Sequence, residues 1–598
     1  MNIRKFSKAI CFLLVLQIFA FSQDLIINTA NRKTTSLNGA WNYIIDPYEM
    51  GYFDFRMNAY DKQKNPSNSA YFKNYHAKNK QELVEYDFDK SPKMMIPNDW
   101  NSQDEKLLYY EGTVWFKKSF DYNLPSKKRL FAYFGAVNYK AEVYLNGTKL
   151  GVHEGGFTPF NFEITSLVKP KDNFLVVKVD NKRRVDGVPT LNTDWWNYGG
   201  ITREVLLIEE PETFIQDYAI QLKKGDKNKL KGYVKLNNSN ASENITISIP
   251  ELKINQEVAS SSDFEINAEN IKYWSLSTPK LYDVFIKTKS QTIKDQIGFR
   301  TIETSGADIL LNGKKVFLKG ISIHEENASG GRGSSEADAL RLLSWAKEMG
   351  CNFVRLAHYP HNENMVRLAD KMGILVWEEV PVYWTVDFTK ETVLANAKNQ
   401  LSEVITRDNN RASVVIWSVA NETPISDVRN NFLLNLVNHA KSLDSTRLLS
   451  AALLHRDING VSTIDDKIGE HLDIVSVNQY LGWYGGKLED AEKIKWSVPY
   501  NKPVIVSEFG GDAKQGLHGQ KNERWTEEYQ EYLYQQNLKM IEKIPNISGL
   551  SPWILVDFRS PRRVLPGIQD GYNRKGLISD KGLKKKAFFV LRDFYKRK

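Results

Sequence analysis

Two stretches decide the fold: Val414-Val-Ile-Trp-Ser-Val-Ala-Asn-Glu422 and Val504-Ile-Val-Ser-Glu508. Each is a short apolar run that ends in a glutamate, as expected for a buried strand whose carboxyl end opens onto a functional surface. After about residue 304, apolar runs of this kind alternate with helical stretches. Eight strands with helices between them predict a (β/α)8 TIM barrel, in which both glutamates lie at the same end. The expected strands are 316–322, 352–356, 374–378, 413–418, 447–452, 473–478, 503–507 and 547–555, and the expected helices are 335–349, 362–372, 392–407, 429–443 and 526–544.

The region before the barrel has a different pattern. Residues 23–211 contain short strands and turns, such as Ala141-Glu-Val-Tyr-Leu145, which runs into the hairpin turn Asn146-Gly147. No long helical period occurs there, which predicts a jelly-roll-like β-sandwich. Strands continue through residues 212–303, a length that suits an immunoglobulin-like sandwich. The expected order is therefore sandwich, sandwich and TIM barrel, with the barrel over residues 304–598.

The first 22 residues are typical of a secretory signal peptide. Arg4, Lys5 and Lys8 precede an apolar run over residues 9–21, and small residues stand before Gln23. The run is too short to predict a membrane span. We therefore expect an exported protein, periplasmic or secreted, two locations that a signal peptide does not distinguish.

The composition excludes several classes of protein. Apolar residues make up 41% and charged residues 26% of the 598 residues, which argues against intrinsic disorder. The net charge is +9, but no long basic run and no nucleic-acid motif accompany it, so no nucleic-acid partner is expected. Cys351 is the only cysteine outside the predicted signal peptide, and we interpret it as a buried structural thiol. The histidines are not spaced as metal ligands, so neither a metal nor a cofactor is expected.

The two strand-end glutamates suit glycoside hydrolysis. A carboxylate at the end of an apolar strand is costly to desolvate unless it has a partner or a chemical role. Two salt-bridged glutamates would be the structural alternative. Paired carboxylates can instead divide the work, one protonated to assist the leaving oxygen and one ionised to attack the sugar. Asn421, beside Glu422, adds a neutral donor for a substrate hydroxyl.

Several motifs together resemble glycoside hydrolase family 2. Trp417-Ser-Val-Ala-Asn-Glu422 and Ser507-Glu-Phe-Gly510 are similar to its acid/base and nucleophile signatures. The resemblance extends to stretches 320–325 and 355–360 of the barrel and to 37–41, 144–147 and 298–301 before it. It implies a sugar-binding type of first sandwich and a retaining enzyme with Glu422 as acid/base and Glu508 as nucleophile. Their carboxyl groups are then expected about 5–5.5 Å apart.

Motifs away from the two glutamates narrow the choice of sugar substrate. The stretches 476–484 and 516–518 resemble those of β-glucuronidases, and Asn573-Arg-Lys575 resembles the Asn-x-Lys element that grips the uronate carboxylate. A cation and an amide are suitable donors for a carboxylate. The predicted substrate is therefore a carbohydrate with a terminal β-D-glucuronic acid. The alternatives are a β-galactosidase or β-galacturonidase of the same family and, in a different class, a carbohydrate-binding protein without turnover.

The resemblance also implies further pocket residues. Asp194 is expected either to contact a substrate hydroxyl or to cap its own loop, and Tyr480 to hydrogen-bond the nucleophile. Glu378 and Glu379 are expected to orient the site. The residues expected to line the sugar pocket are His358, Tyr484, Trp553 and, with a plain ion-pair reading as the alternative, His324. Family members are often oligomers, so a homo-oligomer is expected by analogy.

The chain departs from the subgroup in one loop. Gln569 stands where β-glucuronidases have an arginine, four positions before the motif asparagine, and Arg559, Arg562 and Arg563 precede it. Either one carboxylate contact is lost, or Arg562 or Arg563 supplies it. Three arginines also suggest the hypothesis of a more anionic substrate, such as a sulfated or uronate-rich polysaccharide fragment.

Overall fold

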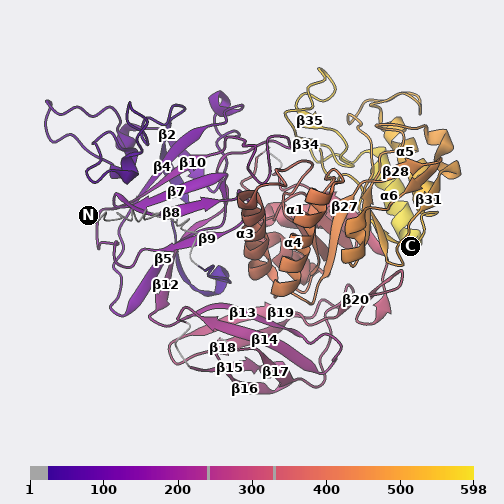
Figure 1. The fold of residues 1–598 in the computed structure, drawn as a ribbon, viewed down its shortest axis with the longest axis horizontal. Helices are drawn as coiled ribbons and strands as arrows, with labels where there is room; N and C mark the ends of the chain where they lie inside the picture. Colours follow the sequence, from indigo (N-terminus) through magenta and orange to yellow (C-terminus); the bar gives the residue numbers. More distant parts are fainter. Residues whose placement is uncertain (1–23, 239–242, 261, 328–330) are drawn as a thin grey trace, which may run out of the picture.

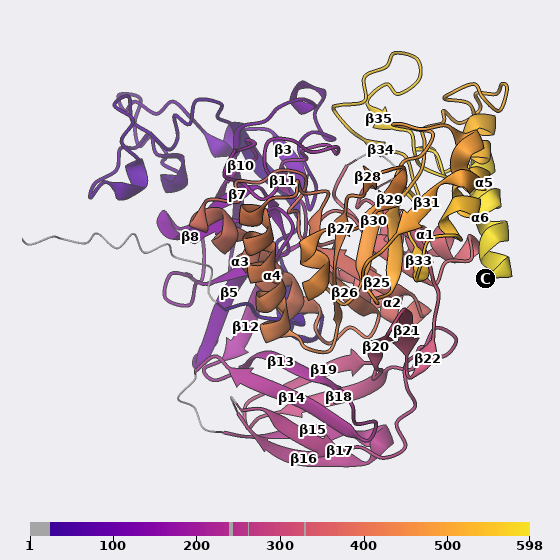
Figure 2. The same ribbon diagram turned by 45° about the vertical axis from the view of Figure 1, so that its right-hand side comes forward.

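The computed structural model describes residues 24–238, 243–260, 262–327 and 331–598. The predicted signal peptide, residues 1–22, lies outside this range. Figures 1 and 2 show three bodies: a β-sandwich coloured indigo to purple, a second sandwich in magenta, and a mixed α/β unit in orange and yellow. No helix within the described ranges is long and apolar enough to cross a membrane.

The first body is a sandwich of a four-stranded and a six-stranded antiparallel sheet. The four-stranded sheet has the order β1 (Lys33–Ser36), β12 (Val205–Pro211), β5 (Lys128–Phe134), β9 (Phe160–Glu163). The six-stranded sheet has the order β3 (Lys93–Ile96), β2 (Gly39–Ile45), β4 (Thr113–Phe120), β10 (Asn173–Asp180), β7 (Lys140–Leu145), β8 (Thr148–Glu154). Alternating apolar residues fill the space between the sheets, including Trp41, Phe116, Val143 and Val177. The predicted hairpin is present, with Asn146 and Gly147 between β7 and β8.

The second body has seven strands in two antiparallel sheets. One sheet has the order β13 (Ile215–Leu222), β14 (Lys229–Leu236), β17 (Phe264–Asn267). The other has the order β16 (Ile254–Ala259), β15 (Asn244–Ile249), β18 (Tyr282–Lys287), β19 (Thr292–Ile297). A small sheet, β20 (Ile302–Ser305), β21 (Asp308–Leu311) and β22 (Lys314–Lys315), then leads to the third body.

The third body confirms the predicted barrel: eight parallel strands close on themselves. They are β23 (Leu318–Ile323), β24 (Phe353–Leu356), β25 (Leu375–Glu379), β26 (Val414–Asn421), β27 (Leu448–Leu453), β30 (Val475–Asn478), β32 (Val504–Glu508) and β33 (Ile547–Leu550). The helices are α1 (Glu336–Glu348), α2 (Glu363–Met372), α3 (Glu391–Asp408), α4 (Asp427–Leu443), α5 (Glu527–Ile541) and α6 (Lys586–Arg597). Strands β24, β25, β26 and β32 are buried along their whole length, as expected for strands covered on both faces.

Local signals explain where the barrel helices begin and end. Ser335 caps α1 in a capping box with Asp338, and Thr526 accepts a hydrogen bond from the backbone of Tyr529 at the start of α5. Gly373 ends α2 in the left-handed conformation (φ 68°), which glycine adopts without a steric penalty. These caps satisfy backbone groups that the helix leaves unpaired.

The barrel departs from strict alternation between β27 and β32. The two connections there hold the 3₁₀ helices η7 (Lys467–His471) and η8 (Leu488–Lys493) in place of α-helices. They also carry a small sheet made of β28 (Arg456–Ile458), β29 (Val461–Thr463) and β31 (Lys495–Ser497). The loop that follows β30 reaches the carboxyl end of the barrel, where the Tyr480 hydroxyl contacts Glu508.

The second sandwich lies under the amino ends of the barrel strands, opposite β34 (Phe558–Arg559) and β35 (Tyr572–Asn573) (Figures 1 and 2). Trp274, which is fully buried, donates its indole N–H to the carbonyl oxygen of Asp370 at 2.8 Å and belongs to the apolar cluster at this end of the barrel. Arg300 donates to the carbonyl oxygens of Ala412 (3.0 Å) and Val414 (2.6 Å). The sandwich thus satisfies backbone acceptors on the barrel as well as covering its apolar base.

We expect Trp274→Ala to lower the free energy of unfolding by about 3–5 kcal/mol, because it removes a buried indole and leaves a cavity between two domains. Guanidinium denaturation followed by tryptophan fluorescence and circular dichroism would measure it. Tyr48→Ala is the control, since Tyr48 is 81% exposed and should change stability little. A Trp274→Ala transition at the wild-type midpoint would contradict this view of the interface.

Candidate active site

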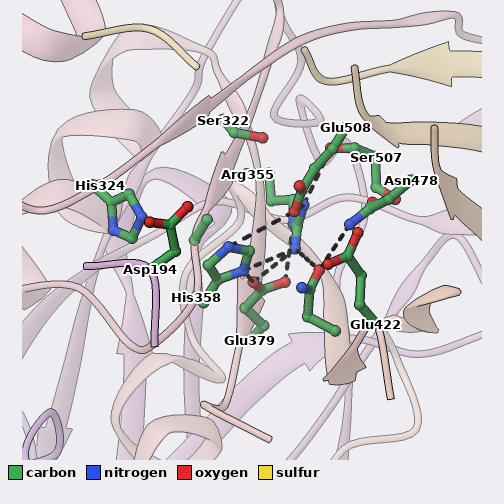
Figure 3. A network of polar contacts seen from close by, with 12 residues as sticks. Asp194, Ser322, His324, Arg355, His358, Glu379, Glu422, Asn478, Ser507 and Glu508 are labelled. Carbon is green, nitrogen blue, oxygen red and sulfur yellow. Dashed lines mark hydrogen bonds and ion pairs between the residues drawn. The ribbon is translucent and has the colours of Figure 1, made fainter. Parts of the chain in front are cut away.

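The two predicted glutamates lie at the carboxyl ends of β26 and β32, on the same side of the barrel (Figure 3). Glu508 is the last residue of β32. Glu422 directly follows β26 with a left-handed backbone (φ 50°), and its N–H donates to the carbonyl oxygen of Ala452 at 2.8 Å. Such a conformation is strained for a residue with a side chain and is held only where the surroundings impose it. The backbone therefore aims Glu422 out of the strand direction and into the barrel mouth.

Both carboxylate oxygens of Glu508 accept hydrogen bonds, one from the buried Arg355 and one from the partly buried Tyr480. Arg355 Nη1 donates to Oε1 at 2.7 Å, and the Tyr480 hydroxyl donates to Oε2 at 2.6 Å, the bond predicted from the sequence. Burial raises the pKa of Glu508 above its usual value, the positive charge of Arg355 opposes the rise, and the nearby carboxylate of Glu422 adds to it. Glu508 is thus an immobilised carboxylate whose ionised form depends on its two donors.

Arg355 connects most of the polar groups at the strand ends. Its guanidinium is fully buried and lies between the carboxylates of Glu379 and Glu508 (Figure 3). It donates to Glu379 from Nε (3.0 Å) and Nη2 (2.9 Å), and from Nη2 to Asn421 Oδ1 (2.7 Å). Burial would raise the pKa of Glu379, but Arg355 and His358 lower it to about 2. Glu379 therefore stays ionised and keeps the arginine in place.

Asn421 is oriented so that its donor is available. Its Oδ1 accepts from Arg355 and, at 3.2 Å, from Asn478 Nδ2. Its buried Nδ2 has no hydrogen-bond partner among the described residues. A buried donor without a partner is unfavourable, and a substrate hydroxyl would satisfy it. This arrangement fits the role predicted for Asn421.

Glu422 has a different environment from Glu508. It is partly exposed, and Oε2 accepts a hydrogen bond from the indole Nε1 of Trp384 at 2.8 Å. Glu508 faces a fixed cation, whereas the hydrogen-bond partner of Glu422 is neutral. Two carboxylates in such unlike surroundings can take unlike roles, one ionised and one exchanging protons.

Four rings pack together beside these groups and form an aromatic wall: His358, Trp553, His324 and Tyr359. The His358 ring stacks on Trp553, with ring centres 4.6 Å apart, and His358 Nδ1 lies 2.7 Å from Glu379 Oε1. His324 Nδ1 lies 2.9 Å from the Tyr359 hydroxyl, and burial, followed by its charged neighbours, holds the pKa of His324 well below its usual value. His324 is therefore neutral and forms part of the wall, and it has no carboxylate ion pair among the described residues.

The adjacent glutamates at the end of β25 point to different places. Glu379 joins the site through Arg355 and His358. Glu378 instead faces Arg407 of α3, whose Nη2 lies 3.4 Å from its Oε1, and burial followed by the neighbouring Asp408 keeps the pKa of Glu378 well above its usual value. Only Glu379 therefore orients the site directly, while Glu378 belongs to the contact between β25 and α3.

Lys575 lies close to the ring of Tyr480, the residue whose hydroxyl bonds Glu508. Its Nζ is 2.7 Å from Asp512 Oδ1 and 3.1 Å from the Tyr484 hydroxyl, and 5.9 Å from the centre of the Tyr480 ring. Burial alone would lower the pKa of Lys575, but Asp512 raises it above its usual value. Lys575 is thus a cation at neutral pH. Gln569 donates to Asp512 Oδ2 at 3.2 Å, so it supports the partner of Lys575.

Asp194 brings the first sandwich into the same cluster. It accepts hydrogen bonds from Ser560 (2.7 Å), Arg563 Nε (3.0 Å) and Asn573 Nδ2 (3.2 Å). Arg563 Nη2 also bonds to Asp194 and lies 3.2 Å from the Tyr484 hydroxyl. Asp194 therefore links the first sandwich to the barrel. Through their shared bonds to Asp194, Arg563 lies close to Asn573 of the Asn-x-Lys motif.

The other two arginines of this loop point elsewhere. Arg562 lies over the ring of Trp384, with its guanidinium carbon 5.0 Å from the ring centre. Arg559 lies 5.3 Å from the centre of the Tyr572 ring, and its backbone N–H donates to Glu326 at 3.1 Å. The three arginines therefore have different partners: Arg559 packs on Tyr572, Arg562 on Trp384, and Arg563 pairs with Asp194.

Sequence reasoning missed several residues of this site. Arg355 had a visible signal, since a charged residue inside the apolar strand Phe353-Val-Arg-Leu356 needs a partner. Asp512 had a weaker one, four positions after Glu508. Trp384 had none, because a loop tryptophan does not reveal which carboxylate its indole contacts.

Comparison with known proteins identifies the same family in all three parts of the chain. Three family models match: "Glycosyl hydrolases family 2, sugar binding domain" over residues 34–211, "Glycosyl hydrolases family 2" over 213–300, and "Glycosyl hydrolases family 2, TIM barrel domain" over 302–596. The β-glucuronidase of Streptococcus agalactiae is 28% identical over 84% of this chain and 91% of that protein. A putative β-glucuronidase of Formosa agariphila is 30% identical over 84% of this chain, and the match spans 66% of that longer protein.

Solved structures give the same result. The β-glucuronidase of an uncultured Clostridium species superposes with a TM-score of 0.81 at 27% identity, over 97% of this chain and 100% of that one. The β-glucuronidase of Ruminococcus gnavus gives 0.82 at 25% identity, over 96% and 100%. The matched sandwich and barrel models together span nearly the whole described chain, and the chain is therefore a glycoside hydrolase that belongs to glycosyl hydrolases family 2.

Proposed function

We propose that this enzyme is an exo-acting, retaining β-glucuronidase. The observation that carries the proposal is the donor cluster of Lys575, Asn573 and Arg563, next to the Tyr480 that bonds Glu508. The relatives named β-glucuronidase support the same assignment. We further propose that residues 1–22 direct export to the periplasm or the medium.

The cluster has donors to spare for a carboxylate. Lys575 carries three N–H donors, of which one bonds the Tyr484 hydroxyl, and its charge is paired with that of Asp512. Arg563 uses Nε and Nη2 for Asp194 and Tyr484, and its Nη1 makes no hydrogen bond within the described part of the chain. The Lys575 side chain is 1% exposed, whereas Tyr484, which lies against it, is 62% exposed. We therefore expect a uronate to contact the exposed Tyr484 first and then Lys575 and Arg563, which both lie against the Tyr484 hydroxyl.

The proposed reaction is a double displacement. Glu508 attacks the anomeric carbon, the bond to the aglycone oxygen breaks, and Glu422 gives its proton to that oxygen. A water molecule then loses a proton to Glu422 and displaces Glu508, which releases glucuronic acid with the original configuration. Asn421 supports this step by donating to a sugar hydroxyl, as its unpartnered Nδ2 allows.

Substitution of the proposed nucleophile tests the mechanism. We expect Glu508→Gln to lower kcat at least about 10³-fold, because the covalent route is lost. Glu422→Gln should lose much less with an activated aryl leaving group, which departs without a proton, than with an alkyl one. Steady-state kinetics with both leaving groups, and proton NMR of the first-formed sugar anomer, would measure this. An undiminished Glu508→Gln enzyme or an inverted product would contradict the assignment.

Substitution of the cluster tests the sugar. The aryl β-glucuronide and β-glucoside differ only in the C6 carboxylate, and β-galacturonide, β-galactoside and β-mannoside complete the panel. We expect the glucuronide to be preferred, and Lys575→Ala and Arg563→Gln each to lower the glucuronide-to-glucoside ratio of kcat/KM at least about tenfold, the effect of one charge-assisted hydrogen bond. A folding defect lowers kcat/KM equally for both substrates, so a change in the ratio reports recognition of the carboxylate. Preference for a neutral glycoside or a galacturonide would refute the proposed sugar.

The pH dependence tests the environment of Glu508. The attacking carboxylate must be ionised, and burial raises its pKa above 4.5, so the acid limb of kcat/KM should lie above pH 4.5. The Tyr480 hydrogen bond favours the ionised form, so Tyr480→Phe should raise the pKa and move the limb up by about one pH unit. Tyr359→Phe is the matched control, since its hydroxyl pairs with His324. An unmoved limb in Tyr480→Phe would contradict this role.

A further inference from the structure

We propose that Arg562 and Trp384 form a subsite for an anionic group on the leaving side of the scissile bond. The natural leaving group is then a saccharide that carries a sulfate or carboxylate next to the cleaved linkage, as at the end of an acidic oligosaccharide. This inference rests on the proposed function and specifies its substrate class.

Trp384 lies on the leaving side because of its contact with Glu422. Its indole Nε1 donates to Glu422 Oε2 at 2.8 Å, and Glu422 is the group that would protonate the leaving oxygen. The backbone holds it there: Trp384 has a left-handed conformation (φ 52°), and its N–H donates to the carbonyl oxygen of Asn421 at 2.9 Å. The ring is only partly buried. A group attached to the leaving oxygen therefore passes next to this ring.

Arg562 places a positive charge on the same ring. Its guanidinium carbon lies 5.0 Å from the centre of the Trp384 ring, and Nη1 donates to Asn192 Oδ1 of the first sandwich. The side chain is exposed, and no carboxylate among the described residues forms an ion pair with it. Arginine has five N–H donors, so most of them remain for a ligand, in the fork geometry that matches sulfate and carboxylate.

The neighbouring residue shows that this orientation is not a general property of the loop. Arg563 turns to the sugar side, where Asp194 neutralises it. Arg562, one residue earlier, turns to the acid/base side and keeps an uncompensated charge. Because an exposed ion pair is weak in water, the cation gains importance mainly when a bound sugar beside Trp384 and Arg562 excludes solvent.

Matched leaving groups test the subsite. Phenyl β-glucuronides with a para-carboxylate or para-sulfonate are compared with the uncharged para-carboxamide and para-sulfonamide, and with a glucuronyl disaccharide that is sulfated or unsulfated on the second sugar. We expect Arg562→Gln to lower the charged-to-uncharged ratio of kcat/KM about tenfold, and about 1 M NaCl to lower the wild-type ratio in the same direction. The sulfonate and carboxylate arms show which anion is preferred.

The control is Arg56→Gln, which removes an arginine that also lies 5.0 Å from an aromatic ring, that of Phe55, on an exposed loop of the first sandwich. It should leave the ratio at the wild-type value. A ratio unchanged in Arg562→Gln, or an equal loss for charged and uncharged leaving groups, would overturn the proposal. If no glucuronide is cleaved, the sugar assignment fails instead, and the same pairs built on the accepted sugar still test Arg562.

Discussion

The active site depends on one buried charge, the guanidinium of Arg355. It lies inside the barrel with no exposure to solvent, which is strongly unfavourable for an unpaired ion. Glu379 and Glu508 compensate it, and the same group orients Asn421. Glu508, its counter-charge Arg355 and the amide of Asn421 are therefore parts of one network. Removal of Arg355 would take the buried counter-charge from two carboxylates at once, so the members cannot vary independently.

The site is also a joint product of two domains. Asp194 comes from the first sandwich and is separated by 369 residues from Arg563, with which it pairs. Asn192, in the same loop, holds Arg562. The barrel supplies Glu422 and Glu508, while the sandwich contacts both arginines of the loop between β34 and β35. The first sandwich is therefore a structural part of the site, because its residues contact the arginines of the barrel loop.

The sequence predicted the parts of this site that follow from strand geometry. Glu422 and Glu508 could be placed together because parallel strands deliver their carboxyl ends to one face of a closed barrel. The Asn573–Lys575 motif was recognisable because of its position after the eighth strand. The pairing of Arg563 with Asp194 could not be predicted, since it depends on how two domains dock. The contact of Trp384 with Glu422 depends on a left-handed loop residue, which no local pattern announces. No helix was predicted on either side of β30, but the small sheet of β28, β29 and β31 in that region was not predicted either.

Arg562 and Arg563 are neighbours in the chain, yet Arg562 lies over Trp384, which bonds Glu422, and Arg563 pairs with Asp194. Under the proposed function, two adjacent residues would thus set the selectivity for the leaving group and the selectivity for the sugar. Point substitutions in this loop can alter one without the other, and divergence among related enzymes could retune the aglycone while the sugar is preserved. An insertion or deletion of one residue has a different effect, because it rotates both side chains out of place together. The length of the loop between β34 and β35 is accordingly under a tighter constraint than its composition.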